Sequence, residues 1–235
     1  MTGGAPPPGS PAVSYPPELA ALDDRFVLQT KSIMFGGRDW ALVMPRSAED
    51  LISEVDFARD ERLPYWADLW ASAIVLAREV SSLDGEPPRT SIEFGAGLGL
   101  PSLAATLRGV RAVVTDYYDD ALLFARRNAV ANLGRDLTTR MVDWRALPDD
   151  LGRFDLVLAA DVLYERPYAP LVARAVTGAI APGGRALIAD PGRVALRACL
   201  AECEALGARV SERCAVPHED GAARHTITIY EVRLG

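Results

Sequence analysis

The chain has 235 residues, of which 49% are hydrophobic, and its formal net charge is −7 at pH 7. This length and composition predict one globular domain with a well-buried core. The acidic balance argues against nucleic acid as a partner, because phosphate backbones are bound by clustered Lys and Arg. No apolar run approaches the roughly 20 residues that span a bilayer, which excludes a membrane protein of that kind.

The start of the sequence lacks the basic residues and apolar stretch of a secretory signal, so we expect a cytoplasmic protein. The three cysteines agree with a reducing compartment, because an odd number without a Cys-x-x-Cys pair favours free thiols. Cys199 and Cys203 are predicted to share one face of a helix as small core residues. We expect no metal site and no membrane partner.

Residues 1–17 are rich in Pro, Gly, Ala and Ser and predict a disordered tail, because they bury too little apolar surface to offset the entropy of ordering. Two apolar runs, 26–35 and 40–44, then flank Gly36-Gly37-Arg38-Asp39, a spacing that predicts a β-hairpin. Ser47-Ala48-Glu49-Asp50 matches a capping box that opens a short helix.

A longer helix is predicted from about Pro64 to Val80, where apolar residues recur at helical spacing and Trp66 and Trp70 lie one turn apart. A linker with one glycine and two prolines, residues 81–90, ends it.

Beyond the linker, short apolar runs alternate with longer helical stretches, which predicts a parallel sheet covered by helices. The last two runs are separated only by a loop with Pro and Gly, which is too short for a crossover and predicts an antiparallel pair. The predicted strands are Ile92–Phe94, Ala112–Thr115, Thr138–Val142, Phe154–Ala160, Arg185–Ala189, Arg209–Val216 and Thr226–Val232.

A glycine-rich turn, Glu93-Phe94-Gly95-Ala96-Gly97-Leu98-Gly99, follows the first of these strands and opens a helix. Its glycines let backbone N–H groups approach a ligand closely, so we expect a nucleotide-like ligand there. Asp116, about 20 residues further on at a strand end, is placed to accept both hydroxyls of an adenosine ribose.

A dinucleotide cofactor fits the turn less well. The dinucleotide pattern Gly-x-Gly-x-x-Gly requires glycine at position 100, where this chain has Leu100. Glu93 would also repel a pyrophosphate, whereas a ligand that carries an ammonium and a sulfonium would be attracted to it.

Together with Asp116, Asp143-Trp144 and the closing strand pair, the glycine turn resembles that of class I S-adenosylmethionine-dependent methyltransferases. The resemblance covers about residues 61–235. It implies a Rossmann-like α/β fold with a seven-stranded, mostly parallel sheet and an antiparallel last strand. We then expect one domain over residues 18–235, with an N-terminal hairpin and helices in 18–88 and the catalytic core in 89–235.

Further motifs resemble the protein-lysine methyltransferases that act on chaperones, elongation factors and the electron-transfer flavoprotein β subunit. They are Tyr65-Trp66-Ala67-Asp68-Leu69-Trp70 and Ala160-Asp161-Val162-Leu163-Tyr164, the second of which contains the Asp-x-x-Tyr motif of that family. Asp190-Pro191-Gly192-Arg193 is similar to the flavoprotein-modifying branch. One departure is Ala71, where family members often have proline.

The resemblance, together with the chemistry of the side chains, implies S-adenosyl-L-methionine as cofactor. Glu93 and the turn backbone would hold its amino-acid end and Asp116 its ribose. Asp143 and Trp144 would bind the adenine with one acceptor and one flat apolar wall. Trp70 would cover the sulfonium through a cation–π contact. The predicted cofactor residues are Trp70, Glu93, Gly95, Ala96, Gly97, Asp116, Tyr117, Asp143, Trp144 and Ala160.

The predicted catalytic residues are Asp161 and Tyr164, which follow the fourth core strand at the edge where open α/β sheets bind ligands. For a lysine acceptor, Asp161 would orient the ammonium and Tyr164 would wall the channel. Three functions remain open at this point: methylation of a protein lysine, methylation of a small metabolite, and a non-catalytic cofactor-binding module. A protein acceptor requires an open, acidic channel mouth, whereas a metabolite requires an enclosed pocket.

Overall fold

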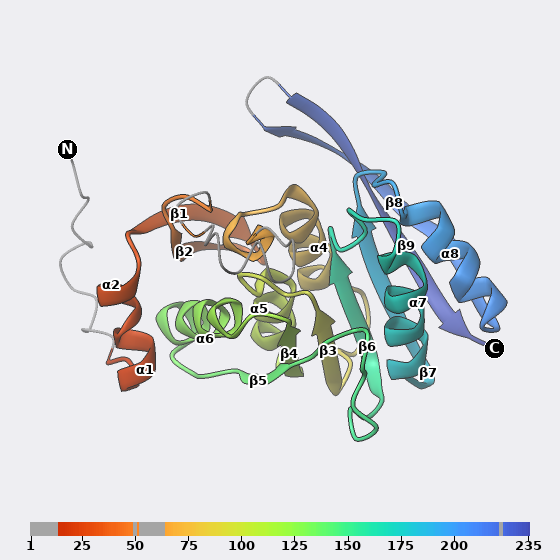
Figure 1. The fold of residues 1–235 in the computed structure, drawn as a ribbon, viewed down its shortest axis with the longest axis horizontal. Coiled ribbons are helices and arrows are strands. Elements are labelled where there is room, and N and C mark those ends of the chain that lie inside the picture. The colour runs from red at the N-terminus through yellow and green to blue at the C-terminus, as the bar shows by residue number, and fades with distance from the viewer. Residues whose placement is uncertain (1–13, 49–50, 52–63, 221–222) are drawn as a thin grey trace.

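The computed structural model describes residues 14–48, 51, 64–220 and 223–235. These residues form a seven-stranded sheet with helices on both faces, beside a separate two-stranded hairpin (Figure 1). The helices are α1 (Pro17–Ala20), α2 (Leu22–Arg25), the 3-10 turn η2 (Tyr65–Ala67), α4 (Ala71–Ser81), α5 (Leu100–Leu107), α6 (Asp119–Leu133), α7 (Tyr168–Ala179) and α8 (Leu196–Ala205). The strands are β1 (Leu28–Phe35), β2 (Arg38–Pro45), β3 (Thr90–Phe94), β4 (Arg111–Asp116), β5 (Thr138–Met141), β6 (Phe154–Ala160), β7 (Ile180–Asp190), β8 (Ala208–Asp220) and β9 (Ala223–Leu234).

The large sheet has the strand order β5-β4-β3-β6-β7-β9-β8. Strands β3 to β7 pair in parallel, whereas β9 pairs antiparallel with both β7 and β8. The predicted Rossmann-like fold is therefore confirmed. The chain order reverses between β3 and β6, and open sheets of this kind bind ligands beyond the carboxyl ends of the strands at that point.

Alternating side chains of the central strands contribute to two hydrophobic cores, one on each face of the sheet. In β6, Leu156 and Leu158 belong to the core under α4, α5 and α6, whereas Val157 and Ala159 belong to the core under α7 and α8. The period of two expected of a strand thus places apolar residues on both faces, as a sheet covered on both sides requires. The strands are fixed along their length, so their carboxyl ends form a rigid base for the site.

The predicted hairpin is confirmed, with a tighter turn than the four residues expected. Phe35 pairs with Arg38, so only Gly36 and Gly37 form the turn, with φ of 59° and 72°. Two successive residues with positive φ define the turn type that best matches strand twist, and glycine adopts it without strain. Trp40 stacks on Phe35 at 4.3 Å between ring centroids and is fully buried.

The outer edge of β2 is paired with two asparagine side chains of α6 rather than with another strand. Asn128 accepts from the backbone N–H of Val43 and donates to its carbonyl, and Asn132 does the same at Ala41, at 2.8 to 3.1 Å. Residues four apart on a helix are separated by about 6 Å, close to the spacing of alternate residues on a strand. The hairpin is therefore attached to α6, the helix that follows β4.

The continuous helix predicted from Pro64 to Val80 is wrong. The segment forms η2, then an extended stretch in which Asp68 has φ −92° and ψ 154°, and only then α4. Trp70 is the extended residue that precedes α4, and its indole N–H donates to the Tyr65 carbonyl at 2.7 Å. Trp66 packs against Phe124 instead, so the two tryptophans do not share a helix face.

The predicted antiparallel pairing of the last two strands is confirmed, but the loop between them is shorter than expected, because β8 continues to Asp220 and β9 begins at Ala223. Pro217 lies within β8, an edge strand, where a missing N–H is tolerated. Pairing of β9 with β7 stops at Asp190 and Thr228, so the remaining pairs form a two-stranded arm. This arm extends past the body of the molecule in Figure 1, beyond the carboxyl end of β7.

Most of the predicted tail, residues 1–13, lies outside the described residues, as does the core of the predicted capping box at positions 49 and 50. The end of this segment contacts α6. Tyr15 already lies against Arg127, with 4.8 Å from the guanidinium carbon to the ring centroid, and Pro17 begins α1. The ion pair of Arg127 with Asp23 at 2.8 Å holds this segment on α6.

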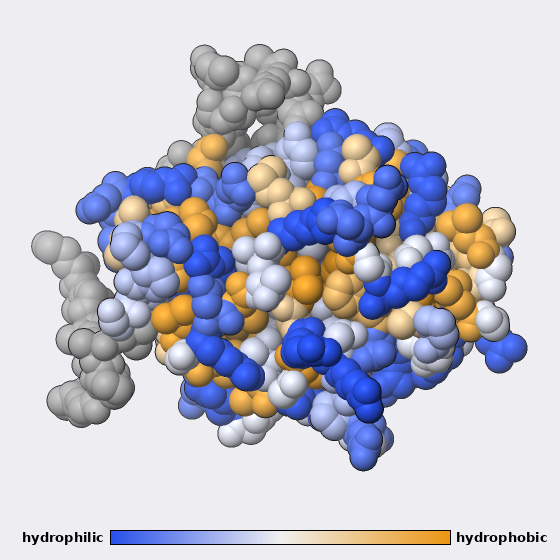
Figure 2. Space-filling model, turned by 90° about the horizontal axis from the view of Figure 1, so that it is seen from below, coloured by the Kyte–Doolittle hydropathy of each residue, from blue (hydrophilic) through white to orange (hydrophobic). Residues whose placement is uncertain are grey.

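Cys199 and Cys203 share the buried face of α8, as predicted, and both are free thiols. Among the described residues, no helix is long and apolar enough to cross a membrane. Hydrophilic residues are interspersed with hydrophobic ones over the face shown in Figure 2.

Candidate active site

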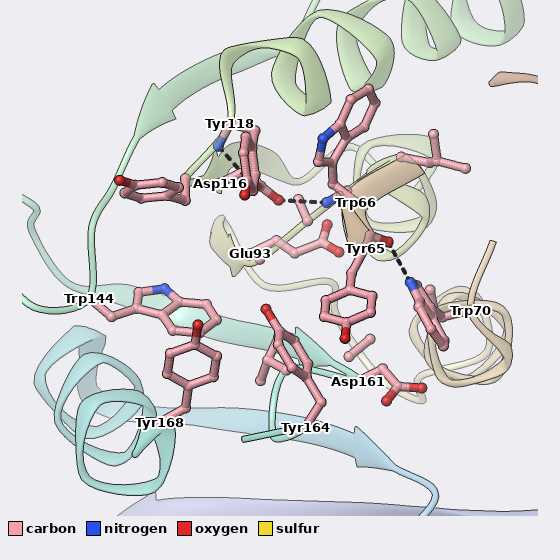
Figure 3. Close-up of a pocket in the computed structure, with 18 of the residues that line it drawn as sticks. Tyr65, Trp66, Trp70, Glu93, Asp116, Tyr118, Trp144, Asp161, Tyr164 and Tyr168 are labelled. Carbon is pink, nitrogen blue, oxygen red and sulfur yellow. Dashed lines mark hydrogen bonds between the residues drawn. The ribbon is translucent and has the colours of Figure 1, made fainter. Parts of the chain in front are cut away.

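One pocket opens at the carboxyl ends of β3, β4 and β6, and every residue predicted for the site lines it. It encloses about 1020 Å³, including its open mouth. Figure 3 shows the two sides of the pocket, with Glu93 and Asp116 on the upper side and the rings of Trp144, Tyr168 and Tyr164 on the lower side. The predicted residues that meet there are Trp70, Glu93, Gly95, Ala96, Gly97, Asp116, Tyr117, Asp143, Trp144, Ala160, Asp161 and Tyr164.

The glycine turn between β3 and α5 has positive φ at Gly95, Gly97 and Gly99, with values of 61°, 51° and 77°. A Cβ at Gly95 would lie 2.8 Å from Cγ1 of Val162, and a Cβ at Gly97 would lie 3.1 Å from the Trp66 carbonyl oxygen. Both positions therefore require glycine for backbone conformation and for packing. This turn brings the backbone into the pocket wall.

Glu93, near the end of β3, is 1% exposed and accepts from the backbone N–H of Ser102 at 2.9 Å. That N–H belongs to the first turn of α5, where helix N–H groups lack partners within the helix and favour negative charge. Burial nevertheless raises the pKa of Glu93 to about 8, and the charge of Asp116 adds to this shift. A positively charged ligand group would relieve the cost of ionising this carboxyl.

Asp116, the last residue of β4, links the turn to the neighbouring strand. Its carboxylate accepts from the backbone N–H of Gly97 at 2.9 Å and from that of Tyr118 at 3.1 Å. Burial raises the pKa of Asp116, against the effect of these hydrogen bonds. Its oxygens can each accept a further hydrogen bond, as a ribose diol would require.

Asp143 and Trp144 lie after β5, on the far side of Asp116 from Glu93. Asp143 pairs with Arg145 at 2.7 Å, and Arg145 also donates to the Tyr117 hydroxyl at 3.3 Å. Trp144 meets Tyr168 edge to face at 5.7 Å between centroids. Asp143, the hydrogen-bond acceptor predicted for the exocyclic amine of adenine, is thus already paired with Arg145. The sequence analysis did not single out Arg145.

The aromatic side of the pocket is a continuous row of five rings from three segments of the chain. Each ring meets the next at a steep angle, with centroid separations of 6.1, 4.8, 5.3 and 5.7 Å along the row. Figure 3 shows the row curving around the lower part of the pocket. Its members in order are Trp70, Tyr65, Tyr164, Tyr168 and Trp144.

Asp161 has φ 59° and is the one non-glycine residue with positive φ among those described. Its N–H donates to the Ala189 carbonyl at 3.0 Å, and its carboxylate accepts from Ser72 Oγ at 3.1 Å and Arg193 Nε at 2.6 Å. Aspartate tolerates this conformation better than most residues, and such strain concentrates at functional sites. The side chain is 4% exposed, so its hydrogen bonds to Ser72 and Arg193 hold the carboxylate in a fixed position in the pocket wall.

Sequence reasoning missed Tyr65, Tyr168 and Arg193 as residues of this region. Tyr65 stands in the Tyr65-Trp66-Ala67-Asp68-Leu69-Trp70 motif, which indicated the family but gave Tyr65 no role, and nothing about the spacing of Tyr168 requires it in the pocket. Arg193 stands in the Asp190-Pro191-Gly192-Arg193 motif, which indicated a family branch but no contact.

Residues 54–191 match the family described as lysine methyltransferase, more than half of the chain. The chain belongs to this lysine methyltransferase family. It is 32% identical over 103 residues to the protein N-lysine methyltransferase METTL21A of Xenopus tropicalis, covering 42% of this chain and 47% of that protein. It is 32% identical over 150 residues to the protein N-terminal and lysine N-methyltransferase EFM7 of Eremothecium gossypii. That match covers 53% of this chain and 55% of that protein. This family member thus spans about half the length of the curated relatives it matches.

Two solved structures resemble the fold of this family member. The glycopeptide N-methyltransferase MtfA, complexed with S-adenosyl-L-methionine, matches with a TM-score of 0.55 at 16% identity, covering 74% of this chain and 99% of that chain. A precorrin-6y C5,15-methyltransferase of Geobacter metallireducens matches with a TM-score of 0.54 at 17% identity. That match covers 69% of this chain and 86% of that chain. At these identities the likeness concerns the fold alone.

Proposed function

We propose that the chain is an S-adenosylmethionine-dependent methyltransferase that methylates the side-chain amine of lysine in a protein. The main support for this proposal is that the acidic residues at the glycine turn and the aromatic row line the same pocket. Membership in the lysine methyltransferase family and the names of the relatives support it.

The residues present fit the proposed cofactor. Glu93 and Asp116 are two carboxyl groups buried in one pocket, and burial raises the pKa of both. A ligand with an ammonium and a sulfonium supplies the positive charge that such a site lacks, whereas a pyrophosphate would add negative charge. In this assignment Glu93 and the turn backbone hold the amino-acid end, Asp116 the ribose, and Trp144 the adenine.

The three tyrosines of the aromatic row, which lie between the two tryptophans assigned to the cofactor, fit a lysine side chain. An alkyl stem packs on ring faces and edges, and a cationic or methylated amine is attracted by the ring quadrupole. Asp68 and Glu165, both exposed, add carboxylates to the pocket lining near its mouth. An open, acidic mouth favours a lysine on a protein surface over an enclosed small metabolite.

The bound cofactor would supply the methyl group on its sulfonium. The chain's own residues align the acceptor and exclude water, which is the main task in an in-line displacement. We propose that Tyr164 walls the acceptor channel and that Asp161 orients the amine by accepting a hydrogen bond beside Arg193 and Ser72. The amine must lose its proton to solvent before it attacks, because only the neutral form has a free electron pair.

The proposal is tested by incubating the purified protein with isotope-labelled S-adenosylmethionine and a proteome from the same cell. Mass spectrometry is expected to find the label on lysine side chains of one or a few proteins, and Asp116→Ala is expected to reduce it. Label recovered only in small molecules would favour metabolite methylation. No transfer by a protein that binds the cofactor would favour a binding module.

The three cysteines, an odd number without a Cys-x-x-Cys pair, support a cytoplasmic location for the reaction.

A further inference from the structure

Arg193 lies in the loop after β7 and reaches two residues of the proposed site. Its Nε donates to Asp161 at 2.6 Å, and its guanidinium carbon lies 5.3 Å from the ring centroid of Trp70. The loop itself is fixed, because the Asp190 carboxylate accepts from the backbone N–H groups of Gly192 and Arg193 at 2.7 and 2.6 Å. The hydrogen bond to Asp190 thus fixes the backbone of Arg193, and the hydrogen bond to Asp161 holds its side chain against the site.

Arg193 and Asp161 form a compensated pair of charges at the acceptor side. Asp161 is 4% exposed and Arg193 is 36% exposed, so the anion is buried and the cation covers it from outside. The neighbouring Asp161 carboxylate raises the pKa of Arg193, which keeps the guanidinium charged. Ser72 contributes a hydrogen bond to the same carboxylate but no charge.

We propose that Arg193 compensates the charge of Asp161 and thereby makes it easier for an acceptor lysine to lose its proton in this site. The inference rests on the proposed function. A bare carboxylate would stabilise the ammonium form of the acceptor, which cannot attack. A cation next to the carboxylate opposes that effect, as neighbouring cations do for reactive lysines generally. Asp161 can then direct the amine through a hydrogen bond without holding it as an ammonium.

In the part of the chain that the structure describes, three titratable groups act on Arg193. Asp161 faces it from the turn after β6, Asp190 from the end of β7 and Tyr65 from η2. Asp190 and Tyr65 stay unchanged in every variant below, so differences between variants report the pair of Arg193 and Asp161.

The first test uses n-butylammonium, a lysine side chain without a backbone, as the probe. Its affinity for the full chain saturated with S-adenosylhomocysteine is measured by calorimetry at pH 7. Arg193→Gln is expected to bind the probe about tenfold more tightly than wild type, because it leaves Asp161 uncompensated. Asp161→Asn is expected to bind it about tenfold more weakly. Arg193→Lys keeps the charge and should stay within about twofold.

Arg197→Gln is the matched control, since Arg197 is an exposed cation on α8, four residues further along the chain. It is expected to leave probe affinity unchanged, and circular dichroism melts show that each variant is folded. If Arg193→Gln binds the probe as weakly as Asp161→Asn, Arg193 only holds the carboxylate in place and charge compensation is refuted. Affinity equal to wild type refutes it as well.

The second test uses the protein acceptor found by labelling and follows turnover against pH. Turnover requires the neutral amine, so the midpoint of its rise with pH follows the proton affinity of the bound acceptor. The midpoint is expected to move to higher pH in Arg193→Gln and to lower pH in Asp161→Asn. Shifts in the same direction, or none, contradict the proposal. If no methyl transfer occurs at all, the proposed function fails, and the butylammonium measurement still decides the role of Arg193.

Discussion

The glycine-turn side of the pocket is held by backbone hydrogen bonds within consecutive βα units, whereas the aromatic side is assembled from side chains of separate segments. Asp116 binds backbone N–H groups of Gly97 and Tyr118, and Glu93 binds that of Ser102. On the other side, Asp161 depends on the side chains of Ser72 and Arg193. We propose that the first side binds the cofactor and that the second binds the acceptor.

If Asp161 serves the acceptor and not the cofactor, changing it should affect turnover and leave cofactor binding intact. Asp161→Asn keeps the shape of the side chain and removes its charge. We expect a loss of turnover on the order of 10²-fold, with cofactor affinity within a few-fold of wild type. Turnover is measured with the acceptor found by labelling, and affinity by calorimetry. Equal losses in both would place Asp161 in the cofactor site.

Asp116→Ala makes the reciprocal change on the glycine-turn side. It removes the proposed ribose contacts and leaves the N–H groups of Gly97 and Tyr118 without their acceptor. We expect cofactor binding to weaken by about 1–3 kcal/mol. Asp119→Ala, at the start of α6, is the control and should bind normally. Unchanged binding by Asp116→Ala would show that the ribose lies elsewhere.

Burial of Glu93 gives the stability of the glycine-turn side a pH dependence. Its pKa is raised from 4.5 to about 8 in the folded chain, so between these values the folded state holds a proton that the unfolded state loses. Stability without ligand should therefore fall as pH rises through this window. Glu93→Gln should flatten that part of the profile of melting temperature against pH. An equally steep decline in the variant would assign the effect to other groups.

The pairing of α6 with the hairpin lies outside both sides of the pocket and should have the smallest functional effect. Asn132→Ala removes two hydrogen bonds to the backbone of Ala41. We expect a loss of about 1–2 kcal/mol in stability by denaturant unfolding, because the N–H and C=O of an edge strand lose their partners. Cofactor affinity should be unchanged. A large loss of affinity would mean that the hairpin shapes the pocket through α6.

The same contrast explains what could be predicted from the sequence. Glu93, the glycines and Asp116 stand at fixed spacing within consecutive strands and turns, so the linear pattern indicated both the fold and this side of the pocket. Tyr65 and Arg193 reach the site from elements far apart in the chain, and no local pattern encodes that meeting.

The error at Trp66 and Trp70 has a related physical cause. Their helical spacing was real, but the backbone between them is extended at Asp68, and the Trp70 indole bonds the Tyr65 carbonyl instead. Long-range packing of Trp66 against Phe26 and Phe124 overrides local periodicity there.

The central claim is that the glycine-turn side binds S-adenosylmethionine independently of the acceptor side. Calorimetric titration of S-adenosylhomocysteine into folded wild type, Asp116→Ala and Asp161→Asn tests it most directly. We expect micromolar binding by wild type, similar binding by Asp161→Asn and at least several-fold weaker binding by Asp116→Ala. Absence of binding by the folded wild-type protein, or equal binding by all three proteins, would contradict it.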